Sequence, residues 1–184
     1  MPRLAAGEAL GAFALSEPEA GSDAASLTAR AEPRGNGWAL YGVKRWVTNG
    51  ARAGVVLIFA RTAAGVSAFL VEPGASGYRV LGTERTLGLR ASETVTVELD
   101  GVGVAQDGLV GQDGHGMRYA LQALDLGRAG ISAQAVGIAR AAMEHAVAYA
   151  LERHQFGKAL ADFGATQAKL AEMHRLIAAA RALA

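Results

Sequence analysis

The chain of 184 residues contains no cysteine. The absence of thiols excludes disulfide bonds, thiolate nucleophiles, thiolate zinc sites and iron–sulfur clusters together. Histidine is scarce as well: there are four, and no two of them form an H-x-x-x-H or H-E-x-x-H pair. We therefore expect no metal site, and any chemistry must depend on serine, histidine, carboxylates or a bound organic cofactor.

Excess charge and long apolar runs are also lacking. Lys and Arg number 18 against 17 Asp and Glu, for a formal net charge of +1, so no long-range field draws the chain to DNA or anionic lipid. No run of about 18 apolar residues occurs, and the first residues do not lead into the apolar region of a signal peptide. The composition predicts a soluble, cytoplasmic protein with no nucleic-acid partner and no membrane insertion.

The motifs of several common enzyme classes are missing. The sequence has no P-loop, no G-x-G-x-x-G and no G-x-S-x-G elbow. A nucleophilic serine would also lack a plausible His/Asp partner set. Classical hydrolase, kinase and metalloenzyme functions are therefore not supported by the residues present.

Two halves of different texture follow one another along the chain. All four prolines precede residue 74, among turn signals such as RGNG at 34–37 and TNG at 48–50. Short segments with strand character lie between these turns, and Val95, Val97 and Leu99 alternate with polar residues as in a half-buried strand. Eight strands with no helix between them predict an antiparallel sandwich or open barrel, and they are expected at 12–15, 27–31, 38–42, 44–47, 55–61, 66–71, 78–81 and 94–99.

Alanine dominates and proline is absent in the second half. We expect Asp113 to cap a helix over about 116–153 and, after a break at 154–164, a second helix from about 165. Each helix has an apolar stripe, but two antiparallel helices do not close a four-helix core. The fold class is therefore a β domain followed by a helical hairpin that is half of a four-helix bundle.

The predicted domains are a β middle domain at 9–112 and a partial C-terminal bundle at 113–184, preceded at 1–8 by the tail of an N-terminal helical region. The second helix reaches the last residue with no C-cap glycine or other stop signal, so we expect a fragment of a larger fold.

Two short segments have residues suited to binding a planar ligand. Residues 14–23 read ALSEPEAGSD, a strand end followed by a turn whose backbone amides and hydroxyls can bind a heterocycle edge or a phosphate. Residues 44–50 read KRWVTNG and place a large aromatic ring beside a hydroxyl at a hairpin turn. Each segment also has a plain alternative on these residues alone: residues 14–23 are an ordinary Pro/Gly turn, and Trp46 is an ordinary core residue.

Five stretches together resemble the acyl-CoA dehydrogenase family, particularly its short-chain-like members. ALSEPEAGSD resembles the family signature and WVTN at 46–49 its second flavin segment. The other three, in matching order and spacing, are LGLRAS at 87–92, LDLGRAGI at 124–131 and RHQFG at 153–157. The resemblance covers nearly the whole chain, from the end of the family's N-terminal helical domain into its C-terminal bundle.

The resemblance implies bound FAD and an acyl-CoA substrate. It assigns substrate contacts to Ser22, Asp125 and Arg128, with Ser22 lying where flavin and acyl-CoA approach each other. Arg153, with Phe156 beside it, is assigned to the FAD pyrophosphate of a neighbouring subunit, a task that suits a planar guanidinium. The cofactor-binding residues implied are Phe13, Leu15, Ser16, Ser22, Trp46, Val47, Thr48, Arg153 and Phe156.

The residues in the helical half also have plain alternatives. Arg128 and Arg153 could be solvated helix charges, and Asp125 could simply pair with Arg128 at a spacing of three. Two positions depart from the family pattern. Gly127 stands where some members have a catalytic glutamate, and Gly164 where a glutamine that contacts FAD is common. Because the glutamate of other members lies beyond Ala184, we expect no catalytic base in this chain.

The function that the resemblance implies is FAD-dependent α,β-dehydrogenation of an acyl-CoA thioester, in a homo-oligomer that passes electrons to an electron-transfer flavoprotein. A carboxylate removes the α-proton in this chemistry and the flavin takes the hydride, which is consistent with a protein that has no thiol. Two alternatives remain open: a non-catalytic flavin-binding or assembly module, and a fragment of an acyl-CoA oxidase-like relative.

Overall fold

The structure is a computed structural model that describes residues 2–184, so Met1 of the predicted 1–8 tail lies outside the described residues. The tail includes a short helix, α1 (Pro2–Ala5). The chain divides into two compact units, Met1–Leu121 and Gln122–Ala184, which are described one at a time.

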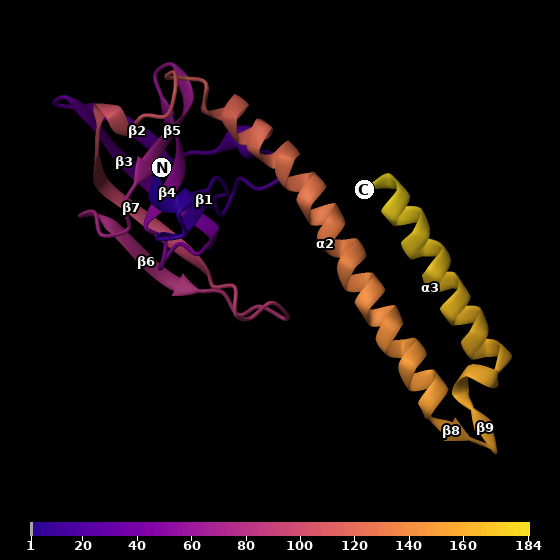
Figure 1. The fold of residues 1–184 in the computed structure, drawn as a ribbon. Coiled ribbons are helices and arrows are strands. Elements are labelled where there is room, and N and C mark those ends of the chain that lie inside the picture. The colour runs from indigo at the N-terminus through magenta and orange to yellow at the C-terminus, as the bar shows by residue number, and fades with distance from the viewer. Residues whose placement is uncertain (1) are drawn as a thin grey trace. The chain divides into compact units, whose positions relative to one another are not determined.

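The first unit is built on a seven-stranded sheet in the order β1-β4-β2-β3-β7-β6, with β5 paired to β4 (Figure 1). Seven strands form rather than eight because the segments predicted at 38–42 and 44–47 are one continuous strand. The strands are β1 (Gly11–Ala14), β2 (Arg30–Arg34), β3 (Gly37–Thr48), β4 (Val55–Thr62), β5 (Gly65–Val71), β6 (Tyr78–Thr83) and β7 (Thr94–Ala105).

The sheet is mixed. β1 runs parallel to β4, from Gly11 opposite Val55 to Ala14 opposite Ile58, and β2 makes one parallel bridge to β4. All other pairs in the sheet are antiparallel. The predicted β domain is present, but a wholly antiparallel arrangement is wrong for these two pairs. The β2–β3 hairpin separates β1 from β4 in sequence, and such a long connection lets two strands pair in parallel.

Two apolar clusters fill the first unit. The larger one contains the predicted inward residues Val95, Val97 and Leu99, while the polar residues alternating with them stay half-buried. The second cluster surrounds Phe59 and includes Leu15. Each fully buried side chain of this size stabilises the fold by about 1.5–3 kcal/mol. The sheet unit therefore has its own core, and this core supports the loops at its edge.

The helices lie close to their predicted limits. The helical segments and the short ribbon between them are α2 (Gly116–Glu152), β8 (His154–Gln155), β9 (Lys158–Ala159) and α3 (Gly164–Leu183), with short 3₁₀ turns η1 (Ala24–Ser26), η2 (Gln106–Gly108) and η3 (Leu160–Asp162). Within residues 2–184, no helix combines the length and the apolarity needed to cross a membrane.

The start of α2 is fixed to the sheet rather than capped by Asp113. The Asp113 Oδ1 atom accepts hydrogen bonds from Thr62 Oγ1 at 2.7 Å and from Ser67 Oγ at 2.5 Å. A Cβ on Gly116 would lie 2.6 Å from the Ser67 carbonyl carbon, so only glycine allows the helix to begin so close to β5. The predicted cap is therefore wrong, because the strand hydroxyls bind this carboxylate.

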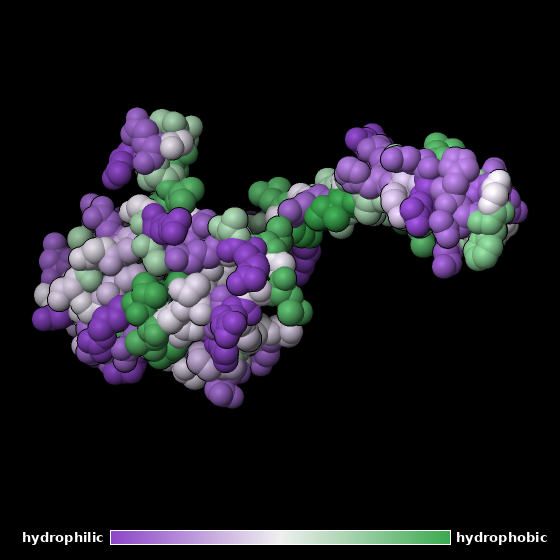
Figure 2. All heavy atoms as spheres, turned by 90° about the horizontal axis from the view of Figure 1, so that it is seen from below, coloured by the Kyte–Doolittle hydropathy of each residue, from purple (hydrophilic) through white to green (hydrophobic). Residues whose placement is uncertain are grey.

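The helices of the second unit form an antiparallel hairpin (Figure 1). On α3, the apolar residues Leu170, Met173 and Ile177 are half-buried, and Ala180 is exposed. An apolar groove of about 520 Å³ runs between residues that include Ala135 and Leu176. Among the described residues of this unit, Ala150 alone is fully buried, and hydrophobic atoms remain at the surface of the molecule (Figure 2).

Candidate functional site

The turn that follows β1 is closed by its own backbone. The Glu17 N–H donates to the Ala20 carbonyl at 2.9 Å, and the Ala20 N–H donates back to Glu17 at 3.2 Å. This pair leaves Gly21 and Ser22 exposed at the far end of the turn, with open space around the Gly21 Cα. The hydroxyl and backbone of Ser22 are accordingly accessible to a ligand.

A β-bulge in β3 carries Trp46. Lys44 pairs with Val97 and Val47 pairs with Val95, so two residues of β3 face a single residue of β7 at this point. Trp46 has a φ of +57°, which is rare for a bulky residue and is found where structure nearby holds it in place. Bulges of this kind redirect side chains, and here the indole is 50% exposed.

The turn and the bulge are joined directly. The Arg45 N–H in the bulge donates to the Ser16 carbonyl at 2.9 Å, so the two segments that the sequence singled out lie side by side. The Arg45 guanidinium lies 5.1 Å from the centre of the Trp46 ring and its Nε is 3.4 Å from a Glu84 oxygen. A cation over one face of the ring and a partner for that cation orient the indole.

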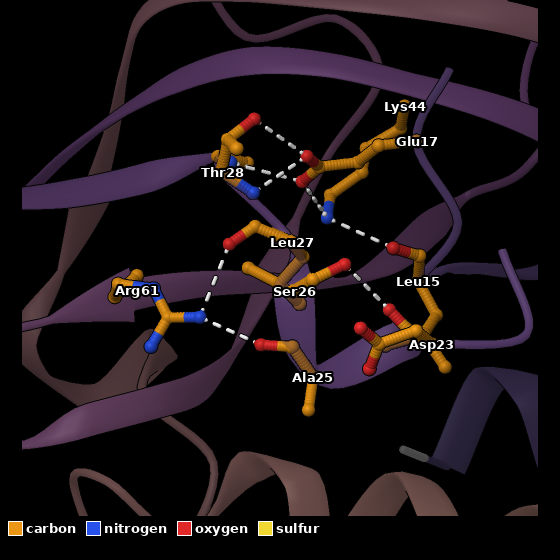
Figure 3. A network of polar contacts seen from close by, with 10 residues as sticks. Leu15, Glu17, Asp23, Ala25, Ser26, Leu27, Thr28, Lys44 and Arg61 are labelled. Carbon is orange, nitrogen blue, oxygen red and sulfur yellow. Dashed lines mark hydrogen bonds and ion pairs between the residues drawn. The ribbon is translucent and has the colours of Figure 1, made fainter. Parts of the chain in front are cut away.

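A buried ion pair joins the residues next to this junction, Glu17 of the turn and Lys44 of β3 (Figure 3). Lys44, whose side chain is fully buried, donates from Nζ to Glu17 Oε1 at 2.8 Å and to the Leu15 carbonyl at 3.0 Å. The Glu17 carboxylate also accepts from the Thr28 N–H at 2.7 Å, the Thr28 hydroxyl at 2.8 Å and the Ala29 N–H at 2.9 Å. Both charged groups of this network therefore have hydrogen-bond partners, as buried charges require.

The pKa values of the pair reflect this environment. Burial acts to raise the pKa of the Glu17 carboxyl, but the hydrogen bond and charge of Lys44, with the backbone bonds from Thr28 and Ala29, outweigh it and lower the pKa below 4.5. Burial lowers the pKa of the Lys44 ammonium, and Glu17 offsets part of that effect. The hydrogen-bonded geometry matches a carboxylate facing an ammonium.

Among the predicted cofactor residues, two have buried side chains and a third is half-buried. The Leu15 and Val47 side chains lie in the two core clusters, and Phe13 is half-buried with its ring centre 4.9 Å from that of Phe59. Thr48 is exposed, and its Oγ1 lies 3.3 Å from the hydroxyl of Thr94. Among the predicted residues of the sheet unit, Ser16, Ser22, Trp46 and Thr48 have side chains that a ligand can reach, whereas the side chains of Leu15 and Val47 are buried and leave only their main chain.

The predicted substrate residues of α2 lie together in the helical unit. Arg128 donates from Nη1 to Asp125 Oδ1 at 2.5 Å, and both side chains are exposed. Gly127, between them, has open space around its Cα, so the position that could hold a base has neither a side chain nor an obstruction. Asp125 and Arg128 thus form the ion pair expected from their spacing of three residues. Their contact with a substrate stays a prediction.

Arg153 and Phe156 lie at the β8–β9 hairpin. Phe156 and Gly157 form its two-residue turn with φ values of +51° and +79°, as turns of this length require. Phe156 is 93% exposed, and its ring centre lies 6.5 Å from that of Phe163. A Cβ on Gly164 would meet nothing within 4 Å, so the glutamine common in the family would fit there.

The two segments are connected by Glu17, Lys44 and Arg45, none of which was predicted as a site residue. Lys44 stands two positions from Gly42 and four from Leu40, on the same side of the strand as buried Leu40. A lysine on the apolar face of a strand signals a buried partner. The lysine alone did not identify Glu17 as that partner, because Glu32, Asp23 and Glu19 are all nearer to Lys44 in the sequence.

Comparison with known proteins agrees with this arrangement. Residues 12–102 match the family model for the acyl-CoA dehydrogenase middle domain, and residues 114–184 match the model for the acyl-CoA dehydrogenase C-terminal domain. The chain belongs to the acyl-CoA dehydrogenase family.

Individual relatives extend this match over the whole chain. An acyl-CoA dehydrogenase of Bacillus subtilis is 45% identical over 100% of this chain and 50% of its own length. The structure of butyryl-CoA dehydrogenase from Megasphaera elsdenii is 38% identical, with a TM-score of 0.95 over 98% of this chain and 49% of that one. A glutaryl-CoA dehydrogenase from Mycobacterium smegmatis in complex with FADH2 is 38% identical, with a TM-score of 0.92 over 97% of this chain and 46% of that one. The chain thus spans about half the length of the relatives it matches.

Proposed function

We propose that this chain is the flavin- and acyl-CoA-binding part of an acyl-CoA dehydrogenase, whose reaction is FAD-dependent α,β-dehydrogenation of an acyl-CoA thioester. The observation that carries the proposal is the bond between the Arg45 N–H and the Ser16 carbonyl, because it holds both proposed flavin segments side by side. Membership of the family and the FADH2 complex of a relative support the same cofactor.

The accessible groups of these two segments suit a flavin. The half-exposed Trp46 ring offers a flat apolar face, and Ser16 and Thr48 offer hydroxyls for the polar edge of a heterocycle. Phe13 adds an aromatic contact, and Leu15 and Val47 contribute through their main chain. Arg153 and Phe156, both exposed on the helical unit, supply a guanidinium for the pyrophosphate of the FAD held by a neighbouring subunit, and an aromatic ring beside it. When bound, FAD accepts the hydride that leaves the acyl β-carbon.

The proposed substrate groups are Ser22, Asp125 and Arg128, which present a hydroxyl and an oriented guanidinium to the acyl-CoA. With glycine at 127, none of these groups is placed to remove the α-proton, so we expect the 184-residue chain to bind ligand without turnover. The proposal also includes the division into a β domain at 9–112 and a helical domain at 113–184, a homo-oligomeric whole protein, an electron-transfer flavoprotein as acceptor and a cytoplasmic location.

Titration of the purified chain with FAD, followed by flavin fluorescence quenching, tests the proposal. Arg153→Gln should weaken binding by about tenfold, the loss expected for a charge-assisted hydrogen bond. The matched control Arg181→Gln, another exposed arginine of the helical unit, should leave the affinity unchanged. Gly164→Gln should strengthen binding. A wild-type chain that does not quench the fluorescence of added FAD, and that is colourless once free FAD is removed, would refute the cofactor assignment and favour an assembly module.

Activity assays with butyryl-CoA complete the test. Neither dye reduction nor oxygen consumption is expected from the chain alone. Dye reduction would refute the absence of a base, and oxygen consumption would favour the oxidase-like alternative.

A further inference from the structure

The buried pair of Glu17 and Lys44 has no part in the proposed contacts with flavin or substrate, yet it is the most enclosed charged group of the sheet unit. It lies where three separate stretches of chain meet. Glu17 belongs to the turn after β1, Lys44 to β3 just before the bulge, and the backbone amides of Thr28 and Ala29 to the segment that leads into β2 (Figure 3).

The contacts of the pair are directed at the main chain of the site. Lys44 Nζ binds the Leu15 carbonyl, one residue before Ser16, and its own backbone leads directly into Arg45, whose N–H binds the Ser16 carbonyl. Lys44 is therefore attached to the turn through its side chain, while its peptide neighbour is attached to the same turn through its backbone. The two attachments fix both the distance and the direction between turn and bulge.

Stability alone does not account for a charge pair at this place. Removing two charges from water costs several kcal/mol per ion, and replacing a buried pair by apolar residues of similar volume is often neutral or stabilising. An apolar pair, however, could not bind the Leu15 carbonyl or the Thr28 and Ala29 amides. What only the charged pair supplies is a defined position for these backbone groups.

We infer that Glu17 and Lys44 are positioning residues of the flavin site: they lock the turn at 16–23 to the Arg45–Trp46 bulge, so that Ser16 and Trp46 meet the cofactor as one rigid unit. This inference rests on the proposed function for its ligand. The coupling of the two segments is a property of the chain and can be measured without any ligand.

The decisive variant is the double substitution Glu17→Gln with Lys44→Met. It removes both charges at once, so no unpaired charge is buried and much of the stability is retained. Residue-resolved amide exchange then reports the junction through Arg45 N–H, and the turn through Ala20 N–H. The Val110 N–H, bonded to the Ala68 carbonyl and outside the hydrogen bonds of the ion pair, is the internal reference. Val102→Ala, in the core on β7, is the control for a general loss of stability.

In the double variant, exchange at Arg45 and Ala20 should rise by about tenfold more than at Val110, as for local opening. The FAD dissociation constant should rise by about tenfold, even if the double variant is as stable as the wild type. Val102→Ala should change exchange at all three amides together and leave the affinity of the folded fraction for FAD unchanged. If the double variant is as stable as the wild type and also has wild-type exchange at Arg45 and Ala20 and wild-type FAD affinity, the pair is only structural and the inference is overturned.

Thr28→Val provides a second, milder test. It removes one hydrogen bond to Glu17 and leaves both charges in place, so the variant is expected to fold. Exchange at Ala20 should rise several-fold more than at Val110, and FAD affinity should fall several-fold; no change in either would also overturn the inference. If the wild-type chain binds no FAD, the proposed function fails, while the exchange data still decide whether the pair couples turn and bulge.

Discussion

The two units of the chain treat apolar and charged side chains in opposite ways. The sheet unit buries Phe59 and Phe69 completely and even encloses an ion pair, whereas the helical unit leaves Leu126 at 81% and Ile131 at 62% exposure. Its ion pairs, such as the one between Arg175 and Glu172, are also on the surface. The comparison indicates that the sheet unit is held by its own core, whereas the two helices of the helical unit leave apolar side chains exposed.

The largest expected effect comes from the core of the sheet unit. Phe69→Ala removes a fully buried ring that packs 5.6 Å from the centre of Trp38, and we expect it to lower the free energy of unfolding by about 3–5 kcal/mol. Urea unfolding monitored by tryptophan fluorescence measures the loss. A cost below about 1 kcal/mol would mean that β5 is loosely packed and that the sheet unit lacks the tight core that distinguishes it from the helical unit.

The second prediction concerns the buried pair and its dependence on pH. Glu17→Gln leaves Lys44 buried without its counter-ion, so it should cost about 3 kcal/mol near neutral pH. Because the folded-state pKa of Glu17 is lowered, its carboxylate stabilises the wild type fully above pH 4.5, and this contribution is lost as the pH falls through that lowered pKa. Urea unfolding at a series of pH values should show wild type and variant converging in acid. A constant difference at all pH values would contradict the assignment.

Part of this contrast could be predicted from the sequence. The alternation at Val95, Val97 and Leu99 identified a half-buried strand, and the alanine-rich second half identified two long helices with an uncovered face. Such patterns repeat with the geometry of one strand or helix, so they can be recognised locally.

The site could be predicted only in part. The motif residues around Ser16 and Trp46 marked both segments, but their junction depends on a bulge at Arg45 and Trp46 that shifts the side-chain alternation of β3. The parallel pairing of β1 with β4 is a tertiary contact between distant segments, which no local pattern encodes. The ion pair was missed for the same reason, because the partner of Lys44 is 27 residues away.

A third prediction tests the junction of the sheet with the start of α2. The Ser67 hydroxyl donates to Asp113 and accepts a hydrogen bond from the Gly114 N–H at 2.6 Å, in a side chain with no exposed surface. Ser67→Ala leaves both partners short of one bond and should cost about 1–3 kcal/mol. Differential scanning calorimetry measures the loss. The exposed Ser76→Ala, with the same chemical change, is the control and should be silent.

The smallest effect is expected on the uncovered face of the helices. Ile131→Ala removes a side chain that is mostly exposed and replaces a β-branched residue by the best helix former. The lost contacts and the gain in helix propensity are both small, so the free energy of unfolding should change by less than about 0.5 kcal/mol.

The protein concentration makes this last prediction informative. If the face is open in solution, the effect of Ile131→Ala stays small at every concentration in urea unfolding and sedimentation experiments. If a second copy covers the face, burial of Ile131 would make the substitution costly, and the cost would appear only at concentrations where the wild type associates. Arg140→Ala is the control. Arg140 is an exposed residue further along α2 whose charge pairs with Glu144, so its substitution reports the general effect of shortening a side chain without loss of an apolar contact. A large cost at Ile131 in a chain that remains monomeric at all concentrations would contradict the contrast between the two units, because it would require a core inside the helical hairpin that its exposed side chains do not form.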